Sequence, residues 1–209
     1  MTEHDDYTSV AESVFMEHII ADLKTVLHKI TALLHEHDIH FTFIGGVALN
    51  MNGYHRQTDD IDLLVDVKDK QKMLELPVGY VRDLSHGRGK AFKWNDPQTK
   101  VEAIYTGEIS GDGVNGLEYV NPDTISQNID GVPVLRLEEL IRYKLSSGIY
   151  GLRGRDLIDV ENLVYLKDLP RNYADGFRKD LKREYIRIWN KVQDRKDLEK
   201  TSGWGKKYY

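Results

Sequence analysis

The sequence of 209 residues contains no cysteine. This absence excludes disulfide bridges, cysteine nucleophiles, iron–sulfur clusters and zinc sites built on cysteine. His, Asp and Glu therefore remain as the side chains that could bind a metal. The sequence also lacks the apolar run of about 18 residues that a membrane span needs, and its acidic start has no signal-like apolar segment. We expect a soluble, cytoplasmic protein with no membrane partner.

An excess of positive charge is missing as well. The chain has 29 Lys and Arg against 34 Asp and Glu, which gives a formal net charge of −5. This balance disfavours general binding to nucleic acid or to an anionic membrane through bulk charge. Apolar residues make up 40% of the chain, which is enough at this length to form a core. We therefore expect one folded unit with at most a small helical appendage.

The spacing of apolar residues predicts strands and helices in the first half of the chain and helices in the last third. Apolar positions three and four residues apart predict a long helix over residues 10–37. The segments expected next are strands at 38–44 and 58–66, helices at 47–52 and 69–76, and a hairpin of strands at 91–94 and 100–105. Helical periodicity returns at 137–147, 155–166 and 174–198.

This order of elements predicts an α/β (α+β) fold, with a mixed sheet flanked by helices and a C-terminal helical portion. The pattern changes near residue 130. We therefore expect an α/β core at residues 1–130 and a helical portion at residues 131–209 that packs on the core. The α/β core should hold the chemistry, and the helical portion could cap it.

The strand expected at 58–66 carries two carboxylates on one face. Asp60 and Asp62 are two residues apart, so their side chains point the same way, with Cα atoms about 7 Å apart, while Ile61 faces the core. Two negative charges this close repel unless a cation lies between them, and carboxylate oxygens suit Mg²⁺ or Mn²⁺. Glu102, on the strand at 100–105, could supply a third ligand and make a two-metal site possible.

A pair of glycines, Gly45-Gly46, ends the strand that precedes this one. Backbone N–H groups at such a turn could bind phosphate oxygens, and side chains there would obstruct the approach. Arg56 and Thr58 lie just before the second strand. They either fix the loop or contact the phosphate side of a nucleotide.

One cation stands on an apolar helix face. Lys144 lies four residues after Leu140 and three after Ile141, so it shares their stripe instead of the wet side of the helix. A lysine in that place seldom lacks a partner. Asp156 or Asp159 of the next helix could pair with it in a structural ion pair, or Lys144 could reach a triphosphate as a point charge.

These motifs resemble the nucleotidyltransferases of the DNA-polymerase-beta superfamily, whose pattern is a strand, a Gly-Gly or Gly-Ser turn and an Asp-x-Asp strand. The matching segments are Phe43-Ile-Gly-Gly-Val-Ala-Leu49 and Arg56-Gln-Thr-Asp-Asp-Ile-Asp-Leu-Leu-Val65. The chain looks most like the small stand-alone members, including the AbiEii-like toxins. A second match, at residues 137–145 and 155–161, resembles the helical part of that group, so the likeness runs over residues 41–166.

The resemblance implies transfer of a nucleoside monophosphate from an NTP to an acceptor, with release of pyrophosphate. It implies that Asp60 and Asp62 bind both metal ions and that Glu102 binds the ion that activates the acceptor. The family more often has Asp at this third position and Ser after the first glycine, so Glu102 and Gly46 are departures. The acceptor could be a small molecule, a protein or a tRNA.

Other interpretations of the same residues stay open. The fold could serve as a catalytically inactive binding or regulatory module, or Asp-x-Asp could be the metal motif of a nucleotide-sugar glycosyltransferase. Asp60 and Asp62 could simply belong to an acidic, solvated surface, and Glu102 could be an exposed residue of the hairpin. Arg155 and Asp156 could serve only to start and cap a helix.

Overall fold

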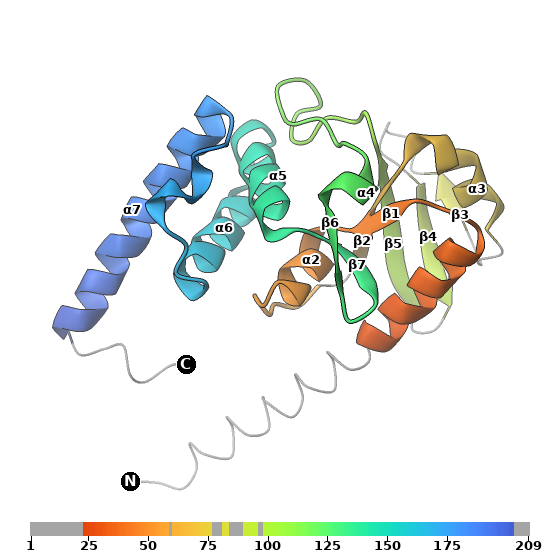
Figure 1. Cartoon of the computed structure of the whole chain (residues 1–209), viewed down its shortest axis with the longest axis horizontal. Helices are drawn as coiled ribbons and strands as arrows, with labels where there is room; N and C mark the ends of the chain where they lie inside the picture. Colours follow the sequence, from red (N-terminus) through yellow and green to blue (C-terminus); the bar gives the residue numbers. More distant parts are fainter. Residues whose placement is uncertain (1–22, 59, 77–80, 84–89, 96–97, 203–209) are drawn as a thin grey trace, which may run out of the picture.

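The computed structural model describes residues 23–58, 60–76, 81–83, 90–95 and 98–202 (Figure 1). Seven strands form one sheet in the order β3-β4-β5-β2-β1-β7-β6. Their bounds are β1 Phe41–Phe43, β2 Asp60–Val65, β3 Val81–Asp83, β4 Lys90–Asn95, β5 Gln98–Tyr105, β6 Ser126–Ile129 and β7 Val132–Leu135. The sheet is mixed, because β2 pairs in parallel with β5 and β1 with β7, whereas the other neighbours are antiparallel.

Helices lie on both faces of this sheet and beyond one end of it. A helix over residues 23–36 precedes β1. The other α-helices are α2 Gly45–Met51, α3 Lys70–Glu75, α4 Pro122–Ile125, α5 Leu137–Tyr150, α6 Gly154–Leu166 and α7 Lys179–Ser202, and two short 3-10 helices cover Val67–Asp69 and Arg171–Ala174. Figure 1 shows α5, α6 and α7 gathered on one side of the sheet.

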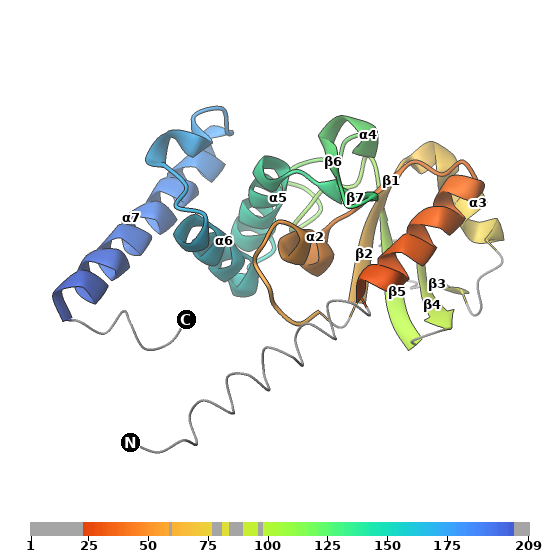
Figure 2. The ribbon, with the colours of Figure 1, turned by 60° about the horizontal axis from the view of Figure 1, so that its bottom comes forward.

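Side chains alternate between the two faces of β2, so its apolar residues pack into two separate cores. Ile61, Leu63 and Val65 are fully buried in a cluster with Leu27 and Ile30 of the helix over residues 23–36. Figure 2 shows this helix against the sheet. The other face of β2 carries Asp60, Asp62 and Leu64, and Leu64 belongs to a second cluster that includes α2, α5, α6 and α7. The two carboxylates therefore lie on the face that the C-terminal helices adjoin.

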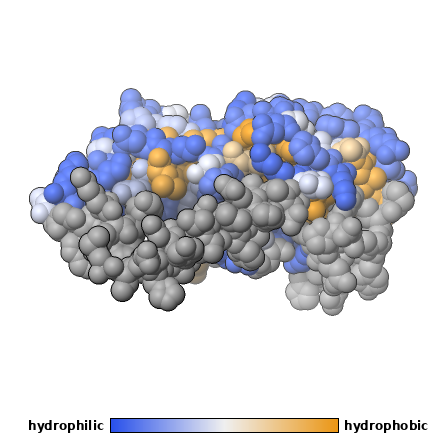
Figure 3. All heavy atoms as spheres, turned by 90° about the horizontal axis from the view of Figure 1, so that it is seen from below, coloured by the Kyte–Doolittle hydropathy of each residue, from blue (hydrophilic) through white to orange (hydrophobic). Residues whose placement is uncertain are grey.

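No helix in the described part of the chain is long and apolar enough to cross a membrane. Figure 3, which views the molecule from below, shows a mostly hydrophilic surface around the grey atoms, with small hydrophobic areas between.

The predicted fold class is confirmed, and most predicted elements appear with shifted ends. Part of the helix expected at residues 10–37 lies outside the described residues, and the described part is helical from 23 to 36. The last helix begins at Lys179 instead of residue 174, because a 3-10 turn and a bend at Asp175-Gly176 come first. The sequence analysis missed β3, α4, β6 and β7, because segments of three or four residues are too short to show a period.

The sheet continues past the division expected near residue 130. β7 pairs with β1 on one side and with β6 on the other, so residues 132–135 belong to the sheet and the helices begin at Leu137. Pro133 interrupts the apolar run of β7 and conceals the strand in the sequence. The division of the chain into an α/β core and a helical portion stays a proposal.

Candidate active site

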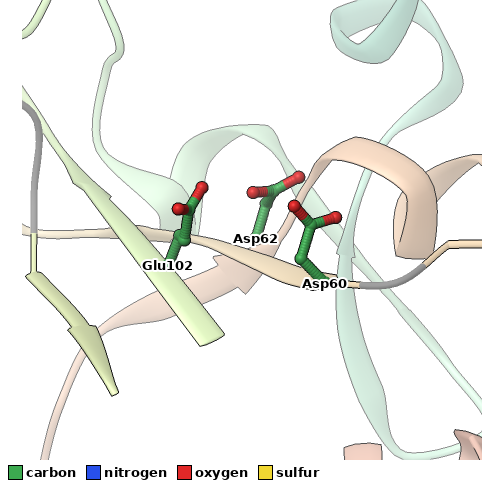
Figure 4. A group of neighbouring side chains, drawn as sticks. All are labelled: Asp60, Asp62 and Glu102. Carbon is green, nitrogen blue, oxygen red and sulfur yellow. The ribbon is translucent and has the colours of Figure 1, made fainter. Parts of the chain in front are cut away.

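Pairing between β2 and β5 brings three acidic side chains together. The two strands are parallel, and their register sets Asp62 directly beside Glu102. Asp60 lies two residues earlier on the same face of β2. One carboxylate oxygen from each of the three residues lies within 4.8 Å of the other two, and Figure 4 shows the three groups pointing to the same side of the sheet. The three side chains are half-buried, so they remain accessible from the cavity described below.

The environment of Asp62 disfavours its charge. Burial raises the pKa of this carboxyl to about 6, and the nearby negative charges of Asp60 and Glu102 contribute, while Lys144 and Arg153 act in the opposite direction. The three carboxylates repel one another, and a cation between them would relieve this repulsion. All of their ligand atoms are oxygens, which Mg²⁺ and Mn²⁺ prefer. The residues present therefore fit a divalent cation.

The glycine pair allows the backbone to approach these side chains closely. Gly45 has φ +58°, and a Cβ atom on it would overlap the Oδ2 atom of Asp62. A Cβ atom on Gly46 would overlap the hydroxyl of Thr58. The sequence analysis explained the pair by phosphate binding alone. The structure adds a steric reason within the protein, because a side chain at Gly45 would displace that of Asp62 and a side chain at Gly46 would displace that of Thr58.

Asn50 of α2 holds the loop that leads into β2. Its side-chain amide donates to the carbonyl oxygens of Gly46 and Arg56, both at 2.9 Å, and its Oδ1 accepts from the Arg56 N–H at 3.0 Å. The Thr58 hydroxyl donates to the carbonyl oxygen of Asp60 at 3.0 Å. These bonds support the interpretation that Thr58 fixes the loop, while its side chain also lines the cavity.

Lys144 is buried between two carboxylates of α6. Its Nζ atom lies 2.7 Å from an oxygen of Asp156 and 2.7 Å from an oxygen of Asp159, and the residue is only 7% exposed. Arg56 reaches the same place, with its Nε atom 3.3 Å from the other oxygen of Asp159. Both partners that the sequence suggested for Lys144 are therefore present, and the charge of Lys144 is balanced within the protein.

Most of these groups line one cavity of about 660 Å³ between the sheet and α5, although Asn50 and Asp159 do not. The nine residues that the sequence analysis selected are all on its wall: Gly45, Gly46, Arg56, Thr58, Asp60, Asp62, Glu102, Lys144 and Asp156. The structure thus brings the predicted residues together, and their roles stay a prediction.

The sequence analysis missed other residues of the cavity wall, notably Tyr119, Tyr143 and Arg153. Tyr119 lies in an irregular segment between β5 and α4, so no periodicity could indicate its direction. Arg153 stands two residues before Arg155, and its closeness to that motif was the one available signal.

Comparison with known proteins agrees with this arrangement. The family described as nucleotidyl transferase AbiEii toxin, type IV toxin–antitoxin system, matches residues 30–202 of the chain. The chain belongs to this family. The AbiEii match confirms the resemblance found in the sequence and extends it at both ends, into the helix over residues 23–36 and through α7. A search of curated proteins found no match.

Three solved structures with names that include nucleotidyltransferase, nucleotidyltransferase-like or adenylyltransferase are similar to the chain at low identity. A nucleotidyltransferase from Thermotoga maritima, TM1012, has 18% identity and a TM-score of 0.48, over 71% of this chain and 95% of that chain. An antigenic nucleotidyltransferase-like protein from Paracoccidioides brasiliensis has 19% identity and a TM-score of 0.49, over 86% and 91% of the two chains. The lincosamide adenylyltransferase LnuA, bound to lincomycin, has 20% identity and a TM-score of 0.47, over 66% and 93%.

Proposed function

We propose that this AbiEii-family chain is a metal-dependent nucleotidyltransferase that moves a nucleoside monophosphate from an NTP to an acceptor and releases pyrophosphate. The observation that carries the proposal is the meeting of Asp60, Asp62 and Glu102 on the wall of one cavity, beside a glycine pair. In the proposal, these three carboxylates hold Mg²⁺ or Mn²⁺, and the glycine pair, Arg56, Thr58, Lys144 and Asp156 form the nucleotide side of the site. The acceptor is a small molecule, a protein or a tRNA.

A bound divalent cation would offset the negative charge of the phosphates and of the attacking oxygen. The protein's own part is to hold three oxygen donors on one face through the pairing of β2 with β5. The glycine pair lets the chain approach Asp62 without a side chain in between. The ion pairs of Lys144 fix α5 against α6, so the opposite wall of the cavity is rigid before substrate binds.

Glu102 has a competing partner. Its carboxylate forms an ion pair with Lys100, two residues earlier on β5, and this contact raises the pKa of the Lys100 amine. The Lys100 side chain is 47% exposed, so it can turn into solvent at little cost. In the proposal, Glu102 would hold the cation as the third ligand in place of its pair with Lys100, and it would accept the proton of the attacking hydroxyl.

The test combines a substrate screen with a double substitution. Radiolabelled ATP, GTP, CTP and UTP are offered with Mg²⁺ or Mn²⁺ to protein, tRNA and small hydroxyl acceptors. We expect incorporation into one acceptor class by the wild type, and its loss in the double variant Asp60→Asn and Asp62→Asn. The matched control is Asp168→Asn with Asp197→Asn, which changes the charge equally at exposed sites. Equal transfer by the active-site variant and the control would contradict the assignment.

Binding separates this proposal from its main alternative, an inactive binding module. If the wild type binds an NTP with Mg²⁺ but transfers it to none of the three acceptor classes, the module becomes the better description. If it binds no NTP, both fail.

A further inference from the structure

Tyr119 is held firmly at every point except its hydroxyl. Its carbonyl oxygen accepts from the N–H of Gly107 at 2.8 Å, and its own N–H donates to the carbonyl oxygen of Glu108 at 2.8 Å. Its ring stacks on the ring of Tyr143, with centroids 4.5 Å apart and an angle of 16° between the planes. The position of the side chain is thus fixed before any substrate arrives.

Tyr143 strengthens this arrangement from α5. Its hydroxyl donates to the carbonyl oxygen of Glu118 at 3.0 Å and accepts from the N–H of Val120 at 3.3 Å. These two residues are the chain neighbours of Tyr119. The hydroxyl of Tyr143 therefore both donates and accepts within the protein, and it holds the backbone on both sides of Tyr119.

The hydroxyl of Tyr119, in contrast, has no hydrogen-bond partner among the residues that the structure describes, although the residue is only 9% exposed. Burial raises the pKa of this phenol, the nearby charges of Asp62 and Asp156 raise it further, and Arg153 lowers it. The phenol therefore keeps its proton at neutral pH and faces the charged part of the cavity. Because Tyr119 lines the cavity, a molecule bound there can supply the partner that the protein does not.

Two exposed arginines, Arg153 and Arg155, lie on this wall, and Arg153 is the one whose charge acts on both Tyr119 and Asp62. Its side chain is 66% exposed, and its ion pair with Asp156 is long at 3.6 Å. Lys144 and Arg56, by comparison, are tied to buried carboxylates at 2.7 Å and 3.3 Å. A guanidinium has five N–H donors in a planar fork that suits a phosphate.

We propose that the Tyr119 hydroxyl and the Arg153 guanidinium bind one phosphate group of the nucleotide. A phosphate offers only acceptor oxygens and a negative charge, which matches a phenol that keeps its proton beside a guanidinium. A neutral acceptor hydroxyl would use the phenol but not the charge of Arg153. This inference rests on the proposed nucleotidyltransferase function and adds two binding residues to it.

The test measures binding, so that it does not depend on knowing the acceptor. The probes are tripolyphosphate and the α,β-methylene analogue of the preferred NTP, each with Mg²⁺, followed by calorimetry. We expect Tyr119→Phe to weaken the binding of both probes about tenfold or more, as for one hydrogen bond to a charged group. Stability against urea should not fall, because the lost hydroxyl has no partner in the described protein. Arg153→Gln should weaken both probes too, and Arg153→Lys should restore part of the affinity.

Tyr185→Phe is the matched control. The Tyr185 hydroxyl donates to the carbonyl oxygen of Pro170 at 3.0 Å in the helical portion, and the residue does not line the cavity. We expect this variant to lose stability and keep its affinity for both probes, the reverse of the pattern for Tyr119→Phe.

Three results would overturn the inference. If the wild type binds both probes and Tyr119→Phe binds them equally well, Tyr119 has no such role and the proposed function stands. If Tyr119→Phe loses affinity for the nucleotide analogue but not for tripolyphosphate, the phenol contacts the sugar or base. If the wild type binds neither probe with Mg²⁺, the proposed function itself fails, and this inference fails with it.

Discussion

At the scale of the single residue, Asp62 shows how a site can be costly for the fold that carries it. Burial and two neighbouring acids disfavour the charge of this carboxyl, so its ionisation lowers the stability of the folded protein. In the unfolded chain the same group ionises near its ordinary pKa of 3.8. The folded state favours protonated Asp62, so this group contributes to the free energy of unfolding fully below about pH 4. That contribution is lost as the pH rises through about 6.

Asp62→Asn should stabilise the metal-free protein at high pH. From the shift of about two pKa units, we expect its free energy of unfolding at pH 7.5 in EDTA to exceed that of the wild type by up to about 3 kcal/mol. The difference should disappear at pH 4, and Mg²⁺ should reduce it at pH 7.5 by stabilising the wild type alone. Urea denaturation at the two pH values measures it, and an Asn variant no more stable than the wild type at pH 7.5 would disprove the argument.

Gly45 makes a second prediction at this scale. Gly45→Ala combines a left-handed backbone with overlap on Asp62, so we expect a loss of about 2–4 kcal/mol in stability, together with weaker Mg²⁺ binding. Gly113→Ala is the control, because φ is +79° there and a Cβ atom would meet nothing within 4 Å. That variant should lose only about 1 kcal/mol. Equal losses in thermal or urea unfolding would show that the overlap at Gly45 has no effect.

At the scale of the elements, α5 and α6 form a pair with charge at its centre. Lys144 of α5 bridges Asp156 and Asp159 of α6, while Gly148 lets Leu157 approach the backbone of α5 closely. Charges in such a place cost desolvation, which the short contacts between them offset. The pair fixes the relative position of two helices that border the cavity.

Removing the positive charge of Lys144 alone should therefore strongly destabilise the protein. Lys144→Met removes the nearest positive charge from two carboxylates and leaves only the longer contacts with Arg56 and Arg153, so we expect a loss of about 3–5 kcal/mol in urea denaturation at pH 7.5. Lys182→Met removes an exposed pair with Asp175, so its effect should stay within about 1 kcal/mol. Adding Asp156→Asn and Asp159→Asn to Lys144→Met should recover part of the loss. A Lys144→Met protein as stable as the Lys182→Met protein would contradict the role of this pair.

At the scale of the whole molecule, one apolar cluster joins the sheet to the C-terminal helices. It includes Ala48 and Leu49 of α2 and Leu64 of β2, together with many residues from α5, α6 and α7. The cavity lies where these parts meet, since its wall takes residues from β2, β5, α2 and α5. The proposed helical portion therefore shares its core with the sheet.

A shared core predicts that the proposed portions unfold together. Replacing Trp94 and Trp204 by Phe leaves Trp189, on α7, as the one tryptophan of the chain. Its indole donates to the carbonyl oxygen of Leu169 at 3.1 Å, so its fluorescence should report the helices. We expect the fluorescence and the far-ultraviolet circular dichroism to change at the same urea concentration. If the fluorescence changes at a much lower urea concentration than the circular dichroism, the helices form a separate unit.

Much of the site could be predicted because its motifs are local. A glycine pair and two carboxylates within eighteen residues indicate a turn and a strand face directly, and a lysine on an apolar stripe indicates a buried partner. Tyr119 and Arg153 could not be found in this way. Both lie outside any periodic segment, so their direction depends on contacts with other elements.

The sequence by itself determined that Asp60 and Asp62 share one face of a strand, because side chains alternate along any strand, and that the chain has the motifs of a nucleotidyltransferase. Only the tertiary structure decided that Glu102 stands beside Asp62, because this depends on the register between two strands distant in the chain. It also decided that Lys144 is balanced by two carboxylates while the Tyr119 hydroxyl is left without a partner in the described chain, since hydrogen bonds between separate elements form only when those elements pack.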